Sequence, residues 1–380
     1  MGKESGSRGP SPQSPVPSPA AGRPPRSVLI IATRRIGDVL LATPLVRSVK
    51  RAWPQAAVDA LVFEGTRGVL AANPDLRRVI AVPERPDMGL HLGFIAGFAR
   101  DYDLALSTQH GDRATLYACL AGRSRLGLLN DTPKERWKRS LLQQWVPFDD
   151  LNTHTVRMNL ALADALGIPR IGEVVVTWTA EEERAAARLI GKDDGRPFAV
   201  LHPYPKFHYK MWRQEAWIEL GRRLTDLDYR IAITGGADDE ELPYNGRIVR
   251  AMPGDSIDAA GKLSFGASAC LVSRARIYVG PDTALTHAAA ALGVPTVALY
   301  GPTNCVKWGP WPRGHSAEAN PWQRVGSQRS GNVLLLQGNI ACVPCHLEGC
   351  DRHVGSYSDC LQEMPVARVI AAIEEILRDG

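Results

Sequence analysis

The chain alternates short, continuous apolar runs with longer segments in which apolar residues recur every three or four positions. The runs are rich in β-branched residues, as in strands buried on both faces of a parallel sheet, and the periodic segments indicate helices that cover such a sheet. Ser27–Thr33 is the first run, and Val39–Arg51 is the helix expected after it. The opening unit is therefore predicted to be strand, loop and helix.

This alternation occurs twice along the chain. In the first half we expect strands at Ala57–Val62, Val79–Val82 and Leu104–Thr108 and helices at Leu92–Arg100, Arg113–Gly122 and His154–Leu166. In the second half we expect strands at Phe198–His202, Tyr229–Thr234, Ile277–Gly280 and Thr296–Tyr300 and helices at Thr179–Ile190, Gln214–Asp226, Asp282–Leu292 and Val366–Arg378. The pattern predicts an α/β protein with two Rossmann-like domains, residues 27–170 and 171–362, and a C-terminal segment 363–380.

Composition narrows the function classes. The chain is 44% hydrophobic and 22% charged, as in globular proteins, and residues 1–26 hold +3 of the net charge of +5. Those residues include seven prolines and five serines without an apolar core, so we expect a disordered leader rather than a signal peptide. The remaining +2 is too weak for a nucleic-acid binder, and no apolar run is long enough to span a membrane. A soluble, cytoplasmic protein is expected.

The loop Arg34–Asp38 follows the first predicted strand and is the first candidate for chemistry. In a doubly wound sheet such a loop opens into the crevice that binds ligands. Asp38 stands at the start of the next helix, and Gly37 before it allows close backbone approach. The pattern leaves two interpretations open, a helix N-cap worth about 1 kcal/mol or a catalytic carboxylate.

Two loops of the second half are candidates for binding an anionic group. A helix predicted to begin near Asp282 follows directly on a strand, so its free N–H groups and positive dipole end would face a ligand. Thr283 would add a hydroxyl and His287 an imidazole, whereas capping by Asp282 with a packed His287 is the alternative. The loop after the first strand of this half carries Lys206 and Lys210, which can reach a phosphate or simply be solvated.

Four of the seven cysteines crowd one C-terminal segment with the spacing C-x2-C-x4-C-x9-C. Thiolates at this density can close a tetrahedral zinc shell, but the spacing departs from paired CxxC knuckles, and packed thiols are the alternative. The residues are Cys342, Cys345, Cys350 and Cys360.

Residues 112–139 carry a net charge of +4, more than the rest of the chain after the leader, with Trp137 and Trp145 near the basic residues. This mixture suits docking on an anionic membrane surface, and a solvated basic face is the alternative. The acceptor-binding candidates of this segment are Arg113, Arg123, Lys134 and Arg136.

Several longer segments resemble the ADP-heptose:lipopolysaccharide heptosyltransferases of glycosyltransferase family 9. The resemblance rests on the segments IGDVLLATPLVRSVKRAWP, LHPYPKFHYKMWRQEAWIEL, the Thr234-Gly235-Gly236 turn and VGPDTALTHAAAALGVPTVALYGPT. The resemblance extends from Ser27 to Leu377, and the segment CVPCHLEGCDRHVGSYSDCLQEMP looks most like the heptosyltransferase III branch. It implies a GT-B fold, in which the two Rossmann-like domains face each other across a cleft, and we expect the C-terminal helix to pack back toward the N-terminal domain.

The resemblance also implies roles for individual residues. The general base of the family falls on Asp38, and the lysine expected to hold the donor phosphates falls on Lys210. The pyrophosphate loop falls on Asp282, Thr283, Ala284 and His287, the adenine pocket on Leu263 and the ribose contact on Glu241. Ala284 replaces the usual glycine, which would cost about 1 kcal/mol if the position needs a positive φ, and Tyr204 replaces a small or hydroxylated residue.

From these roles we expect inverting transfer of heptose from ADP-heptose to a sugar hydroxyl of the lipopolysaccharide inner core. No cofactor or divalent metal is expected, because no Asp-x-Asp motif follows a predicted strand. The partners would be ADP-heptose, the lipid-linked acceptor and the anionic cytoplasmic face of the inner membrane, without nucleic acid. A family 9 enzyme for another nucleotide sugar or acceptor, and a non-catalytic glycan-binding protein on the same scaffold, are the alternatives.

Overall fold

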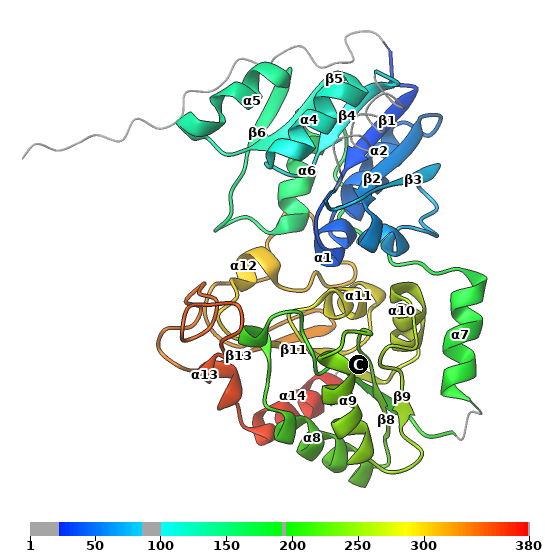
Figure 1. The fold of residues 1–380 in the computed structure, drawn as a ribbon, viewed down its shortest axis with the longest axis vertical. Helices are drawn as coiled ribbons and strands as arrows, with labels where there is room; N and C mark the ends of the chain where they lie inside the picture. Colours follow the sequence, from blue (N-terminus) through cyan, green and yellow to red (C-terminus); the bar gives the residue numbers. More distant parts are fainter. Residues whose placement is uncertain (1–22, 86–99, 192–194, 379–380) are drawn as a thin grey trace, which may run out of the picture.

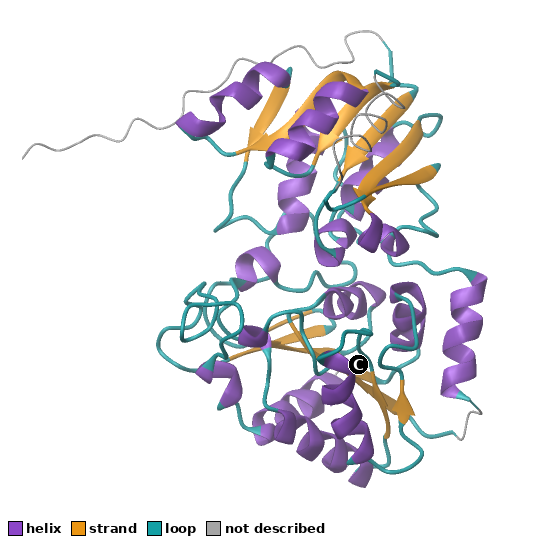
Figure 2. Ribbon diagram, viewed as in Figure 1, coloured by secondary structure: helices purple, strands orange, loops and turns teal. Residues whose placement is uncertain are grey.

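A computed structural model describes residues 23–85, 100–191 and 195–378 of the protein. Two α/β domains are stacked along the long axis of the molecule (Figures 1 and 2). The helix expected at Leu92–Arg100, apart from Arg100, and residues 1–22 of the expected leader lie outside the described residues.

The N-terminal domain is a parallel sheet of six strands in the order β3-β2-β1-β4-β5-β6. The strands are β1 (Ser27–Ile31), β2 (Ala57–Phe63), β3 (Arg78–Val82), β4 (Tyr102–Ser107), β5 (Gly122–Leu129) and β6 (Gln144–Pro147). The helices are α1 (Ile36–Leu40), α2 (Thr43–Ala52), α4 (Asp112–Ala121), α5 (Arg136–Leu141) and α6 (Thr155–Ala165), with the short 3-10 helices η1 (Glu64–Val69) and η2 (Pro133–Glu135). The strand order reverses between β1 and β4, so the loops after these two strands open into a crevice.

The single helix expected at Val39–Arg51 is in fact two helices, α1 and α2. Pro44 stands near the start of α2, where its missing N–H is tolerated, but in one continuous helix its ring would clash with the carbonyl of Leu40. The Thr43 hydroxyl donates to that carbonyl at 2.7 Å instead. The break leaves α1 as a short helix directly after the β1 loop.

The C-terminal domain has seven strands in the order β12-β13-β11-β10-β7-β8-β9, all parallel except β12. The strands are β7 (Phe198–Leu201), β8 (Arg230–Ile233), β9 (Ile257–Asp258), β10 (Ile277–Pro281), β11 (Thr296–Tyr300), β12 (Gln328–Ser330) and β13 (Val333–Gln337). The helices are α7 (Ala180–Ile190), η3 (His208–Lys210), α8 (Gln214–Asp226), α9 (Glu241–Arg250), α10 (Phe265–Ser273), α11 (Ala284–Leu292), α12 (Cys305–Trp308), α13 (Asp359–Gln362) and α14 (Val366–Arg378). Here the order reverses between β7 and β10.

Apolar packing also joins the two domains beside the crevice. Val39 and Leu40 of α1 belong to the same buried cluster as Leu285 and Ala288 of α11. Full burial of such a side chain contributes roughly 1.5–3 kcal/mol, so this seam holds the loops of the two sheets in a defined relation.

The final helix, α14, packs on the C-terminal domain, so the prediction that it packs toward the N-terminal domain is wrong. It contacts α8, β11 and β13, and Val369, Ile373 and Ile376 are buried in the same cluster as Trp217 and Leu220. The apolar stripe of α14 packs against the apolar face of α8, and burial of this stripe accounts for the position of α14 on the C-terminal domain.

Candidate active site

The two places where the strand order reverses, the switch points of the two sheets, line one cleft of about 790 Å³, which is large enough for a nucleotide sugar. The N-terminal wall is formed mainly by the segment from Thr33 to Asp38, which follows β1. The opposite wall is formed mainly by residues of the loops after β7 (206–210), β10 (282–287) and β11 (302–304), with 346–348 of the cysteine segment beside them. Parallel strands thus deliver loops from three C-terminal strands to one side of the same cleft.

Asp38 occupies the third position of α1, with Arg35 at the N-cap, so Asp38 is not the N-cap residue. Its side chain is 12% exposed and lies 4.0 Å from the Arg34 guanidinium. Burial raises the pKa of Asp38 above its ordinary value of 3.8, although the positive charges of Arg34 and Arg35 oppose the shift. A carboxylate whose proton affinity is raised in this way is suited to accept a proton from a substrate hydroxyl.

Lys210 and Asp282 form an ion pair on the opposite wall, with 2.5 Å between Nζ and Oδ2. Burial alone would raise the pKa of Asp282, but Lys210 and His287 outweigh it and the pKa lies below the ordinary value. His287 Nε2 lies 3.8 Å from the same carboxylate, and burial lowers the pKa of His287 to about 4. His287 is therefore neutral near pH 7, and its buried Nδ1 has no hydrogen-bond partner among the described residues.

The start of α11 presents backbone N–H groups to the cleft. Thr283 is the N-cap, and its hydroxyl accepts a hydrogen bond from the N–H of Thr286, so the capping role considered for Asp282 belongs to Thr283. Ala284 is the first residue of the helix and does not adopt a positive φ. The strain considered for an alanine at this position is therefore absent, and the helix start keeps its positive dipole end toward the cleft.

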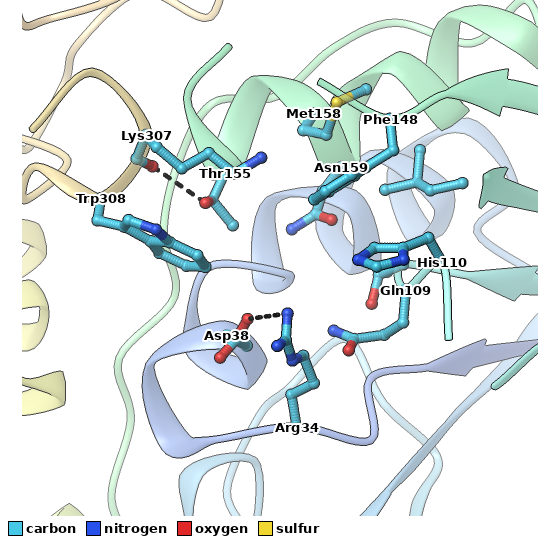
Figure 3. A pocket seen from close by; sticks show the side chains of 12 residues that line it. Arg34, Asp38, Gln109, His110, Phe148, Thr155, Met158, Asn159, Lys307 and Trp308 are labelled. Carbon is cyan, nitrogen blue, oxygen red and sulfur yellow. Dashed lines mark hydrogen bonds and ion pairs between the residues drawn. The ribbon is translucent and has the colours of Figure 1, made fainter. Parts of the chain in front are cut away.

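Asp38 also lines a smaller recess of the N-terminal domain (Figure 3). Arg34, Gln109, His110 and Asn159 surround the same space. Two side chains from α12 of the other domain, Lys307 and Trp308, complete it. The recess has a volume of about 20 Å³, which is room for a hydroxyl-sized group rather than a sugar ring, and Asp38 stands where it meets the large cleft.

Sequence reasoning gave no role to most residues of the recess. Gln109 and His110 follow β4 directly, so their position after a buried parallel strand was an available signal. Thr155 and Asn159 come from α6, and Trp308 comes from the short α12, for which the local pattern gives no comparable signal.

Leu263 and Glu241 do not line the cleft. Leu263 packs against the buried cluster that joins the two domains, and the carboxylate of Glu241 accepts a hydrogen bond from the N–H of Gly236 at 2.6 Å. Tyr204, one of the two departures from the family pattern, donates its hydroxyl to Glu240 at 3.1 Å and packs edge-on against Tyr244. The adenine and ribose contacts stay predictions.

The four basic acceptor candidates are dispersed. Arg113 lies closest to the cleft, since it donates to the carbonyl of Glu84, a cleft residue, at 2.6 Å. Arg123 stands at the amino end of β5 and pairs with Asp103 at 3.4 Å, so it cannot share a site with Asp38 at the carboxyl ends of the strands. Lys134 and Arg136 are exposed on η2 and α5 and do not line the cleft. Arg123 therefore does not lie beside Asp38, and acceptor binding by the four basic residues stays a prediction.

The zinc alternative for the cysteine segment is not supported. Cys342 and Cys350 are exposed whereas Cys360 is buried, and across residues 23–85, 100–191 and 195–378 no three His, Cys, Asp or Glu side chains are placed to hold a metal ion. Cys360 packs in the buried cluster under α14, and burial, with smaller contributions from the other three thiols, raises its pKa to about 12.

The chain is similar to known proteins of the family that its sequence segments resemble. The profile of glycosyltransferase family 9 (heptosyltransferase) matches residues 98–329. Lipopolysaccharide heptosyltransferase 3 of Escherichia coli K12 is 27% identical over 288 residues, which is 72% of this chain and 82% of that protein.

Solved structures share the fold. The glycosyl transferase family 9 protein of Veillonella parvula has a TM-score of 0.75 at 19% identity and covers 93% of this chain and 98% of its own. The Escherichia coli heptosyltransferase WaaC with ADP has a TM-score of 0.68 at 22% identity and covers 92% of this chain and 99% of its own. The GT-B fold expected from the sequence is confirmed.

Proposed function

The chain belongs to glycosyltransferase family 9, and on this basis we propose that it transfers heptose from ADP-heptose to a sugar hydroxyl of the lipopolysaccharide inner core, with inversion at the anomeric carbon. The observation that supports the proposal best is the placement of Asp38 opposite Lys210 and the start of α11 across one cleft. The curated relatives act on lipopolysaccharide, as their names state, and a solved heptosyltransferase holds ADP-2-deoxy-2-fluoro heptose.

In the proposed reaction each wall has its own task. Asp38 removes the proton from the acceptor hydroxyl, whose oxygen attacks the anomeric carbon while the bond from that carbon to the ADP phosphate oxygen breaks. The ADP that leaves is already stable as an anion, so it needs charge stabilisation more than a proton. Lys210, the N–H groups at the start of α11 and neutral His287 are placed to supply that stabilisation.

The reaction itself is tested by mixing the protein with ADP-heptose and inner cores truncated at successive sugars. We expect one core to gain the mass of a single heptose unit as ADP is released, both followed by mass spectrometry. Binding of a core without any mass gain would favour a glycan-binding protein, and transfer from a different nucleotide sugar would favour another family 9 activity.

Transfer is expected to continue in EDTA. Lys210 and the dipole of α11 would meet the pyrophosphate charge that a divalent ion meets in many other transferases. The measurement is the initial rate after dialysis against EDTA, with and without added Mg²⁺. A complete loss in EDTA that Mg²⁺ restores would contradict metal independence.

We propose that the protein docks peripherally on the cytoplasmic face of the inner membrane through the exposed surface of α5 in the N-terminal domain. Trp137 is 45% exposed on α5, next to the exposed Arg136. Basic and aromatic side chains of this kind attract anionic lipid. No helix within the described ranges is long and apolar enough to cross a bilayer.

Vesicle sedimentation measures this docking. The wild type is expected to bind phosphatidylglycerol vesicles at low salt and to release them at high salt, and Arg136→Glu should weaken binding by about fivefold or more. Leu227→Ala, which removes an exposed apolar side chain of α8's C-terminal end, is the control and should bind as the wild type does. Equal binding by all three proteins would refute docking through α5.

A further inference from the structure

Lys307 of α12 is a buried lysine that reaches from one domain into the other. Its side chain is 1% exposed. The ammonium donates to the carbonyl of Asp149 at 2.7 Å, lies 4.2 Å from the centre of the Phe148 ring and stands 4.0 Å from the Asp150 carboxylate. All three partners belong to the loop between β6 and α6 of the N-terminal domain.

Attachment of α12 to the N-terminal domain does not require this charge. The Thr155 hydroxyl donates to the carbonyl of Lys307 at 3.0 Å (Figure 3), and the Asn304 amide donates to the carbonyl of Leu151 at 2.8 Å. His154 also hydrogen-bonds the carbonyl of Gly309 at 2.7 Å. These neutral hydrogen bonds already dock the helix, whereas removing an ammonium from water costs several kcal/mol. A buried lysine at this position therefore has a role other than attaching α12 to the N-terminal domain.

The charge stands at the wall of the recess that contains Asp38. Phe148, which the ammonium contacts, lines this recess together with Trp308, the neighbour of Lys307. Among the described residues, the charged groups that act most on Lys307 are Asp150, Asp149, Asp38 and Arg34, and Lys307 in turn acts on His154. The carboxylates outnumber Arg34, and burial keeps His154 neutral because it lowers the pKa of that imidazole to about 3.

The same short helix is tied to the donor side of the cleft. The hydroxyl of Tyr300 donates to the carbonyl of Trp308 at 2.8 Å and lies 3.4 Å from Asp282, the partner of Lys210. A shift of α12 would therefore disturb the wall of the recess and the surroundings of the ion pair together.

We propose that Lys307 is a positioning residue for the acceptor: it holds the Phe148 wall of the recess in which the attacking hydroxyl lies and places a positive charge near Asp38. The inference rests on the proposed transferase function. It assigns part of the acceptor site to the nucleotide-binding domain, so the recess is complete only when α12 is docked on the N-terminal domain.

The test compares Lys307→Met, Lys307→Arg and the control Lys50→Met in transfer from ADP-heptose to the core that the wild type accepts. Lys50 also donates to backbone carbonyls, of Pro54 and Ala56, at 2.9 and 3.0 Å, but away from the cleft. Lys307→Met should lower kcat/KM for the core by about 10- to 100-fold, as misplacement of a reacting group does, with ADP affinity within about twofold of the wild type. Lys50→Met should leave kcat/KM unchanged.

The pH dependence of kcat/KM distinguishes a role for the positive charge of Lys307 from a role for its packing alone. Burial lowers the pKa of Lys307 to about 8, so wild-type kcat/KM for the core should fall as the pH rises through that value and the ammonium loses its charge. An arginine stays protonated there, so Lys307→Arg should retain its activity to higher pH. At low pH, kcat/KM should fall as Asp38 is protonated, and this acidic limb should lie at higher pH in Lys307→Met, because losing a positive charge raises the pKa of Asp38.

Three results would overturn the inference. The first is kcat/KM unchanged in Lys307→Met, and the second is a loss matched by an equal loss of ADP affinity with both limbs of the profile unmoved. The third covers the case in which Lys307→Met does not fold: an alkaline limb near pH 8 that persists in Lys307→Arg. Failure of the wild type to transfer heptose to any core would instead refute the proposed function.

Discussion

Asp38→Asn should lower kcat by about 10²- to 10⁴-fold while leaving the affinity for ADP near that of the wild type. Asparagine keeps the size of the side chain and its place in α1 but cannot accept the proton of the attacking hydroxyl. Single-turnover transfer measured by mass spectrometry gives the rate, and titration calorimetry with ADP gives the affinity.

The pH profile adds an independent signature of the same group. The carboxylate acts only when it is ionised, so kcat/KM should fall as the pH falls through the pKa of Asp38. Burial raises that pKa above the ordinary 3.8, and the midpoint of the acidic limb should be correspondingly higher. The Asn variant should lose this limb.

Glu84→Gln is the matched control for Asp38, since Glu84 is an acidic residue that lines the same cleft. Its rate should stay within about threefold of the wild type, because an exposed carboxylate that takes no part in proton transfer contributes nothing to general base catalysis. A near-normal rate in Asp38→Asn would rule out Asp38 as the general base, and a comparable loss in Glu84→Gln would mean that the general charge of the cleft matters more than one carboxylate.

Lys210→Ala should weaken ADP binding by about 10- to 100-fold, because a hydrogen bond to a charged group contributes roughly 1.5–3 kcal/mol. The loss has two parts. The pyrophosphate loses a cation, and the nearly buried Asp282 loses the ammonium that neutralises it at 2.5 Å, so a negative charge is left beside the phosphates. The pKa of Asp282 should rise for the same reason, and ADP affinity should recover partly at low pH.

Lys262→Ala is the control for this second variant. Lys262 also pairs with an aspartate, Asp258, at 2.6 Å, but the pair is exposed and does not line the cleft. Its loss should leave ADP affinity unchanged in calorimetry. Unchanged affinity in Lys210→Ala would exclude this lysine from the donor site.

Many elements with one dominant local signal could be predicted from the sequence, although β13, with the apolar run VLLL, was missed. Ser27–Thr33 is continuously apolar, so β1 and the Asp38 loop were expected where they occur, and the β10–α11 junction was expected for the same reason. β5 was missed because its first residues include Arg123 and Arg125, which interrupt the apolar run, and β6 was missed because it begins with glutamine and ends with proline. Short or partly charged strands depend on their neighbours in the sheet more than on their own pattern.

Contacts between distant segments explain the remaining differences. The position of α14 depends on the face that α8 offers, and the recess depends on α12 docking across the domain boundary, neither of which a local window of sequence contains. The four basic acceptor candidates are dispersed because they were chosen by charge along the chain, whereas the amino and carboxyl ends of one strand lie on opposite edges of the sheet.

The loops at the two reversals of strand order line one cleft, so acceptor and donor specificity can change separately in such an enzyme. The loops after β1 and β4, together with the start of α6, surround the space proposed for the acceptor, whereas the loops after β7 and β10 carry the groups proposed for the nucleotide sugar. Exchange of the first set between relatives should redirect which glycan is extended while the donor stays the same. α12 crosses this division, so a chimera that exchanges the N-terminal loops has to inherit the matching α12 as well.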